Sequence, residues 1–283
     1  MSKLLIVTAD DVGLHRGTTL GAVDAHERGI VTACSVVAGG RDLRHAVELL
    51  RGRRRLAVGV HLTLVEGIPV SPPSEIRSLV GRDGMFLPGF RAFLRRWAAC
   101  RVSLRQVELE LRRQIEVLLE AGLDVTHANG HQHLHVLPGV LEVALRLAVE
   151  YGIAFVRVPI DRQLRGVPLA RSVLVHGLGC LGRRARRRAR THGVATNDAT
   201  IGIADAGHLS PARLAEFLPL VDGVTELVCH PGVDGRALSD EYRWGYEWDQ
   251  ETAALCDPAL REAIRLAGII LARPAEAAGR QNG

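Results

Sequence analysis

Short runs of apolar, β-branched residues alternate along the chain with longer segments in which apolar residues recur at helical spacing. The runs predict strands at residues 4–8, 31–37, 56–62, 124–127, 154–158 and 224–229. The longer segments predict helices at about residues 17–28, 42–50, 104–119, 138–151, 211–220 and 258–267. Repeated alternation of strand and helix predicts a parallel sheet.

Two stretches show no clear period. Residues 66–90 are rich in Pro and Gly, and residues 161–208 are rich in Arg and Gly. We interpret both as long loops or insertions over the rim of the sheet.

The chain length of 283 residues suits one α/β barrel or two average domains. No linker or break in composition divides it, so we predict a single (β/α) barrel-like domain over residues 1–275. This domain would resemble a TIM barrel, either distorted or seven-stranded, with insertions at its rim. Residues 276–283 are predicted to form a flexible C-terminal tail.

The composition is that of an ordinary globular protein, with 47% hydrophobic and 24% charged residues. The first apolar run is too short for a secretory signal, and no run approaches the roughly 18 apolar residues of a membrane span. The five cysteines are far apart and include no C-x-x-C pair, which argues against a disulfide framework or a zinc knuckle. These features predict a cytoplasmic protein.

Polar side chains stand at the carboxyl ends of four predicted strands. Asp10 and Asp11 follow the first strand and His61 closes the third. The block HANGHQHLH (residues 127–135) follows another strand, and His230 follows the last. Because the carboxyl ends of parallel strands share one face of the sheet, we expect these side chains to converge there.

An aspartate and two imidazoles suit Zn²⁺, and are acceptable to Mg²⁺ or Mn²⁺. Asp11, His61 and one histidine of the block 127–135 could supply these three ligands, which leaves positions open for water and substrate. Two adjacent carboxylates do not easily face the same ion. Asp10 is therefore predicted to act as a general base on water, or to orient it.

Each of these residues also has a simpler interpretation. The Asp10–Asp11 pair could cap the following helix or lie in a solvated turn, and His61 could be a hydrogen-bonded core or rim histidine rather than a metal ligand. Strand alternation would place His131, His133 and His135 on one strand face, whereas helical spacing would pair His127 with His131, and in either case the block could be a polar loop with internal hydrogen bonds. His230 could cap a strand. The metal site is favoured because all of these groups fall on one rim.

At these positions the sequence resembles the YdjC-like carbohydrate deacetylases. The resemblance spans about residues 3–235 through five segments in the same order: LLIVTADDVGL, GIVTACSVVAGG, VGVHLTLVEGIPV, THANGHQHLHVLP and ELVCHPG. It implies an α/β-barrel-like fold and metal-dependent removal of N-acetyl groups from amino sugars.

Carried over by position, the family pattern makes Asp11, His61 and His131 the metal ligands. The usual segment reads H-x-D-S-H-H-H-x-H, so Asn129 and Gly130 stand here for Asp and Ser, and Gln132 for the middle histidine. A neutral amide cannot supply a carboxylate's charge to a neighbouring imidazole. Val12 also replaces the common Phe. His127, His133 and His135 are expected to shape the pocket or to hold the loop, and these three together with Asn129 are predicted to bind the substrate.

The predicted reaction is metal-assisted amide hydrolysis, with Asp10 as base and His230 as the acid that protonates the departing amine. Trp244, in YRWGYEW, could stack on a sugar or an apolar aglycone, or pack under a loop. The rival functions are another metal-dependent barrel hydrolase, such as a phosphoesterase or amidohydrolase, and a non-catalytic glycan- or lipid-binding protein. Such hydrolases often use a carboxylated lysine, and lysine is very rare in this chain.

Two further segments, GRDGMFLPGFRAFLRR and ATNDATIGIADAGHLSPARL, resemble the subgroup associated with hopanoid biosynthesis. This resemblance implies an N-acetylglucosaminyl hopanoid or similar glycolipid as substrate. The run RRARRRAR (residues 183–190) could be a solvated segment, or could contact an anionic membrane surface at the inner face. No aromatic residues interleave it, so no nucleic-acid partner is predicted. The oligomeric state is left open, with a homodimer as one alternative.

Overall fold

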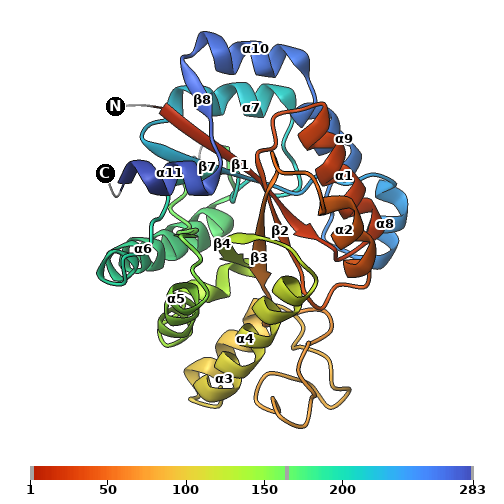
Figure 1. Cartoon of the computed structure of the whole chain (residues 1–283), viewed down its shortest axis with the longest axis vertical. Helices are drawn as coiled ribbons and strands as arrows, with labels where there is room; N and C mark the ends of the chain where they lie inside the picture. The colour runs from red at the N-terminus through yellow and green to blue at the C-terminus, as the bar shows by residue number, and fades with distance from the viewer. Residues whose placement is uncertain (1–2, 163–165, 282–283) are drawn as a thin grey trace.

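A curled sheet of parallel strands occupies the centre of the protein, and helices surround it (Figure 1). The computed structural model describes residues 3–162 and 166–281. The strands of the described residues are β1 (Lys3–Val12), β2 (Ala33–Val36), β3 (Ala57–Leu62), β4 (Val125–Gly130), β5 (Phe155–Val156), β6 (Ala199–Ile201), β7 (Val224–Cys229) and β8 (Ile269–Leu271).

The strand order is β5-β4-β3-β2-β1-β7-β6, and β8 pairs with the beginning of β1. The sheet curls so far that its two edges meet. Isolated parallel bridges join Phe155 to Ala195 and Asp161 to Thr200. β1 lies at the centre and is buried from Leu4 to Val12, which explains its continuous apolar run. This architecture confirms the predicted barrel-like fold.

The α-helices of the described residues are α1 (Arg16–Glu27), α2 (Leu43–Leu50), α3 (Phe90–Ala98), α4 (Leu104–Glu120), α5 (Val140–Glu150), α6 (Leu169–Thr191), α7 (Pro211–Phe217), α8 (Gly235–Glu241), α9 (Trp248–Leu255), α10 (Pro258–Leu266) and α11 (Pro274–Gln281). Two 3₁₀ segments are η1 (His131–Val136) and η2 (Leu218–Leu220). The hydroxyl of Ser103 accepts a hydrogen bond from the Gln106 amide, so it caps α4.

The structure corrects the prediction of a long loop at residues 161–208, which contains α6 and β6. The buried side of α6 is lined by small residues, including Gly182, Ala185 and Ala189. Such residues carry little hydrophobic signal, and the arginines between them hide the period. Residues 67–89 contain no helix or strand, in agreement with the other predicted loop.

The end of the chain also differs from its prediction. Residues 276–281, expected to be part of a flexible tail, belong to α11. Ala277 and Ala278 of this helix are buried, and they belong to the same apolar cluster as Phe155 of β5 and Ala57 of β3. Residues 282–283 of the predicted tail lie outside the described residues. Among the helices that the structure describes, none combines the length and the apolar character needed to cross a bilayer.

Candidate functional site

The predicted rim residues do converge at the carboxyl ends of the strands. Asp10 and Asp11 come from β1, His61 from β3, His131 from the start of η1, and His230 from the residue after β7. They border a cavity of about 250 Å³. Its other lining residues are Gly130, Gln132, His133, Ile203, Ala206, Val228, Trp244 and Tyr246. A larger groove of about 760 Å³ lies at the opposite ends of the strands, between α1, α10 and β8. Within the described residues, the only group of His, Cys, Asp and Glu side chains arranged to hold a metal ion is at the first cavity.

Backbone geometry directs two adjacent aspartates toward this cavity. In a regular strand, consecutive side chains point to opposite faces of the sheet. The pairing of β1 with β2 shifts register between Ala9 and Val12, and Asp11 has a positive φ of 62°. Such a bulge with a left-handed residue re-aims side chains, and backbone strain of this kind is typical of functional sites.

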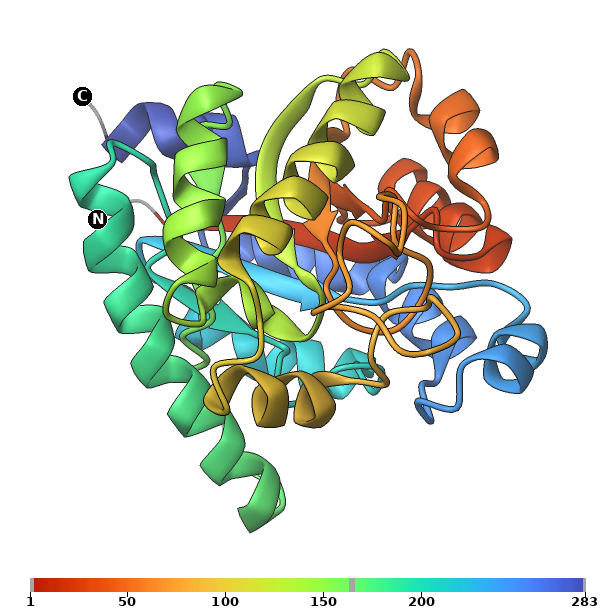
Figure 2. The same cartoon turned by 90° about the horizontal axis from the view of Figure 1, so that it is seen from below.

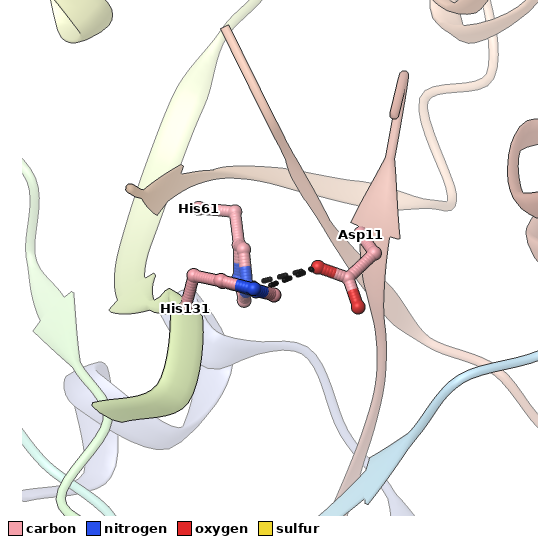
Figure 3. A group of neighbouring side chains, drawn as sticks. All are labelled: Asp11, His61 and His131. Atoms are coloured by element: carbon pink, nitrogen blue, oxygen red, sulfur yellow. Dashed lines mark hydrogen bonds and ion pairs between the residues drawn. The ribbon is translucent and has the colours of Figure 1, made fainter. Parts of the chain in front are cut away.

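Asp11, His61 and His131 form a tight, buried cluster (Figure 3). Asp11 Oδ1 lies 3.3 Å from His61 Nε2 and 3.1 Å from His131 Nδ1. The two imidazole nitrogens are 3.3 Å apart. Bonds of about 2.0–2.1 Å to a tetrahedral ion would separate the ligand atoms by roughly 3.3 Å. The donor set and its spacing therefore fit a divalent cation such as Zn²⁺.

Hydrogen bonds orient both imidazoles for this arrangement. His61 Nδ1 lies 2.7 Å from Asn129 Oδ1 and 3.0 Å from Ser35 Oγ, which leaves Nε2 facing Asp11. His131 Nε2 lies 3.3 Å from Glu66 Oε2, which leaves Nδ1 facing Asp11. Burial raises the pKa of Asp11, but the charges and hydrogen bonds of the two histidines hold it well below its usual range.

A buried ion-pair network holds Asp10 beside the cluster. Arg157 donates to both Asp10 oxygens, at 2.5 and 2.9 Å, and also pairs with Glu226 at 2.8 Å. Asn129 Nδ2 and Ser35 Oγ donate to Asp10 Oδ1, at 2.9 and 3.0 Å. Burial raises the pKa of Asp10, but the Arg157 charge outweighs it and keeps the pKa below its usual range. Asp10 is therefore held as a carboxylate.

Sequence reasoning missed the two charged residues of this network. Arg157 and Glu226 each interrupt an apolar strand, and both are almost fully buried. A charged residue inside an apolar strand is the signal that points to such a pair, because burying it without a partner is costly.

The histidine block is neither a regular strand face nor a helix. His127 and Asn129 lie on β4, and η1 begins at His131. Gln132 and His133 both have left-handed backbone, with φ of 49° and 56°. This turn brings His131 and His133 to the cavity, while Leu134 packs in the core.

The remaining members of the block lie behind the cavity wall, which differs from the expected substrate contacts. His127 is buried against Gly59 of β3, and burial lowers its pKa to about 3. His135 is buried with Nε2 2.9 Å from the Arg157 carbonyl, and burial lowers its pKa to about 4. Asn129, fully buried, bridges His61 and Asp10. These three side chains support the site and do not line the cavity.

His230 and two aromatic rings form the opposite side of the cavity. His230 Nε2 lies 4.0 Å from Asp11 Oδ2, and Nδ1 is buried without a hydrogen-bond partner in the part of the chain that the structure describes. Burial lowers the pKa of His230. The Trp244 ring is 5.5 Å from the His131 ring, and the Tyr246 ring is 5.1 Å from the His230 ring. Trp248, in contrast, is buried in the core.

The sequence is similar to proteins named as deacetylases of carbohydrates. A human protein named carbohydrate deacetylase is 34% identical over 289 residues, covering 94% of this chain and 88% of the relative. A protein of Escherichia fergusonii named chitooligosaccharide deacetylase is 35% identical over 164 residues, covering 58% of this chain and 61% of the relative.

A solved structure and a sequence family also match almost the whole chain. A crystal structure from Enterococcus faecalis, of a proposed cellobiose-phosphate cleavage protein, superposes with a TM-score of 0.80 at 26% identity, covering 98% of this chain and 99% of that one. The sequence pattern of the YdjC-like protein family matches residues 4–266. The chain therefore belongs to the YdjC-like protein family.

Proposed function

We propose that this protein is a hydrolase that removes the N-acetyl group from an N-acetylated amino sugar and releases acetate. The observation that carries the proposal is the buried cluster of Asp11, His61 and His131, with Asp10 beside it in one cavity. The names of the relatives support the same reaction class. Asp11, His61 and His131 would hold a divalent ion, either Zn²⁺ or Mg²⁺, with Mn²⁺ as an alternative.

When bound, a divalent ion supplies a Lewis acid that polarises the acetamide carbonyl and lowers the pKa of water. Asp10 then accepts a proton from the water as its oxygen bonds to the carbonyl carbon. Arg157 holds both Asp10 oxygens and thereby fixes the direction of this transfer. Because its pKa is held below the usual range, Asp10 stays ionised over the whole neutral pH range.

His230 is our candidate for the group that protonates the departing amine when the C–N bond breaks. Since burial lowers its pKa, the imidazole is neutral before the reaction. It must therefore gain its proton during turnover, and the proton released by water attack is the available source. Acetate and the free amino sugar then leave the cavity.

Acetate release is the measurement that tests this function. The purified protein, loaded with Zn²⁺, Mg²⁺ or Mn²⁺ in parallel, is assayed on a panel of N-acetylated sugars, chitooligosaccharides and glycolipids, together with phosphate esters and simple amides. Acetate from an N-acetylated sugar supports the proposal. Turnover of phosphate esters or simple amides alone would favour another barrel hydrolase. Sugar binding without turnover under every metal would favour a non-catalytic glycan-binding protein.

Metal uptake is expected to release a proton. Burial lowers the pKa of His131, but the charges and hydrogen bonds of Asp11 and Glu66 raise it to about 10. The imidazole is therefore protonated in the metal-free protein at neutral pH, and a metal must displace that proton. The affinity for Zn²⁺ should rise about tenfold per pH unit between pH 7 and 9 and level off above pH 10. Chelator competition measures this slope, and equal affinity at pH 7 and pH 9 would contradict it.

Trp244 is proposed to stack on the sugar ring, because it lines the cavity next to His131. Trp244→Ala should raise KM about tenfold, equivalent to about 1.4 kcal/mol, with little change in kcat. Trp244→Phe keeps an aromatic face and should recover most of the loss. Steady-state kinetics on the best substrate of the panel distinguish the two variants. An unchanged KM for Trp244→Ala would exclude the stacking role.

We further propose that the N-acetylated sugar is linked to a lipid, as in an N-acetylglucosaminyl hopanoid. In α6, Arg183, Arg184 and Arg187 are exposed, whereas Arg186 and Arg188 pair with Asp198 and Glu142. The amino-terminal end of α6 extends beyond the rest of the molecule (Figure 2). It carries three exposed apolar side chains, Leu169, Val173 and Leu174. Together these residues would suit an anionic membrane surface at the cytoplasmic face.

Vesicle binding tests this contact. Each basic side chain near an anionic surface contributes about 1 kcal/mol, so the triple change Arg183→Gln, Arg184→Gln and Arg187→Gln should weaken binding about 100-fold. Changing the exposed Arg101 and Arg105 to Gln, outside α6, serves as the control. Sedimentation with phosphatidylserine-containing vesicles at physiological salt measures both. No binding of the unmodified protein would remove the membrane contact and leave the deacetylase proposal untouched.

A further inference from the structure

Glu66 is assigned no role by the sequence patterns, yet its carboxylate contacts His131 of the metal-ligand cluster. It lies just beyond β3, at the start of the long loop of residues 67–89, and has a positive φ of 54°. Its Oε2 is 3.3 Å from His131 Nε2, and its Oε1 accepts a hydrogen bond of 2.9 Å from Gln132 Nε2. Each carboxylate oxygen therefore has a separate partner.

The contact with His131 determines which ring nitrogen is free to bind a cation. His131 Nδ1 is the atom that faces Asp11 Oδ1 and His61 Nε2. A neutral imidazole can offer Nδ1 as a ligand only when its proton is on Nε2. The Glu66 carboxylate accepts a hydrogen bond from His131 Nε2–H and so favours this tautomer. A carboxylate in this position also makes the imidazole a stronger electron donor.

The two imidazoles of the cluster differ in this respect. The far nitrogen of His61 faces the neutral amide oxygen of Asn129 and the hydroxyl of Ser35. The far nitrogen of His131 faces the carboxylate of Glu66. The chain thus places a carboxylate behind His131, and an amide and a hydroxyl behind His61.

Gln132 holds Glu66 in place. Its amide nitrogen donates to Glu66, and its amide oxygen accepts a hydrogen bond of 2.6 Å from the Phe90 backbone. The Gln132 side chain therefore bonds to the two residues that flank the loop of residues 67–89, Glu66 and Phe90. Gly89 leaves space for this contact, because a Cβ there would lie 3.2 Å from Glu66 Oε1.

We propose that Glu66 is a positioning residue for His131, which sets its Nδ1-binding tautomer and strengthens metal binding, and that Gln132 orients Glu66. This rests on the metal site of the proposed function and is independent of the substrate. It also means that the loop of residues 67–89 is anchored at its base by the same hydrogen bonds that prepare the metal ligand.

Zn²⁺ affinity, measured by competition with a chromophoric chelator, tests the proposal on the full-length protein. Glu66→Ala should weaken Zn²⁺ binding about 10–100-fold when the affinities are compared at their pH-independent limit, where no proton competes for His131. Glu66→Gln keeps an oxygen acceptor without the charge, so its affinity should fall between those of Glu66→Ala and the unmodified protein. Gln132→Ala should weaken binding to a smaller degree. Glu75→Gln, an exposed glutamate on the same loop, is the matched control and should bind Zn²⁺ normally.

A second readout separates positioning from a general effect on the fold. The visible absorption of the Co²⁺-loaded protein reports the ligand field, and it should change in Glu66→Ala but not in Glu75→Gln. Thermal unfolding of the metal-free variants shows whether they remain folded. If Glu66→Ala does not fold, the isosteric Glu66→Gln provides the measurement instead. Unchanged Zn²⁺ affinity in both Glu66 variants, or equal weakening in Glu75→Gln, would overturn the proposal. If the Glu66 effect is present but no acetate is released from any substrate, the hydrolase function fails and the positioning role stands.

Discussion

Replacing Asp10 with asparagine is expected to lower kcat for acetate release by about 10²–10⁴-fold while Zn²⁺ binding remains intact. Asp10 is outside the cluster of cation ligands, and its oxygens are occupied by Arg157, Asn129 and Ser35. Asparagine has nearly the same shape but cannot accept the proton of the attacking water. The two properties, metal retention and turnover, should therefore separate in this variant.

Stopped-flow or steady-state acetate detection, together with metal analysis of the same preparation, provides the test. Asp24→Asn is a suitable control, because the Asp24 side chain pairs with Arg28 at the surface of α1 and does not line the cavity. Full activity of Asp10→Asn would refute its assignment as the base. Loss of the metal in this variant would instead assign Asp10 to the metal site.

His61→Ala is expected to abolish metal retention and with it nearly all turnover. The remaining Asp11 and His131 provide two ligands, fewer than the three protein ligands of a catalytic zinc site. Losing a Lewis acid worth several kcal/mol should reduce kcat/KM by about 10³-fold or more. His45→Ala is the control, since His45 lies on α2 and pairs with Asp42 outside the cavity. Dialysis followed by metal analysis checks the first effect. Wild-type metal content in His61→Ala would exclude it from the ligand set.

The sequence was sufficient to predict that the polar residues at the strand ends meet at one site. The inference needed only the strand positions and the rule that carboxyl ends of parallel strands share a face. Both come from local patterns, which are strong for β1, β3 and β7. The convergence of Asp10, Asp11, His61, His230 and the histidine block around one cavity followed from them, whereas the choice of His131 within the block came from the resemblance to the YdjC-like family.

The orientation of these side chains could not be predicted in the same way. Whether Asp10 points into the cavity depends on the bulge in β1, and the role of His131 depends on the left-handed backbone of Gln132 and His133. Both features depend on the backbone conformation of single residues, which the spacing of hydrophobic residues does not predict. The partners Glu66 and Arg157 are distant in sequence, and their contacts depend on rotamers set by packing.

The helix α6 was missed for a different reason. Its buried stripe consists largely of Gly and Ala, so the apolar signal on which period analysis depends is weak. The short strands β6 and β8, of three residues each, are likewise too brief to show an alternating pattern. These elements gain their stability from tertiary packing rather than from local preference.

The central claim is that Asp11, His61 and His131 bind one divalent ion between them. A crystal structure of the Zn²⁺-loaded protein, with anomalous data collected on both sides of the zinc absorption edge, tests it most directly. We predict a single strong anomalous peak at about 2.0–2.2 Å from Asp11 Oδ1, His61 Nε2 and His131 Nδ1. A peak bound by other residues, or a loaded protein with no peak between these three atoms, would contradict the account.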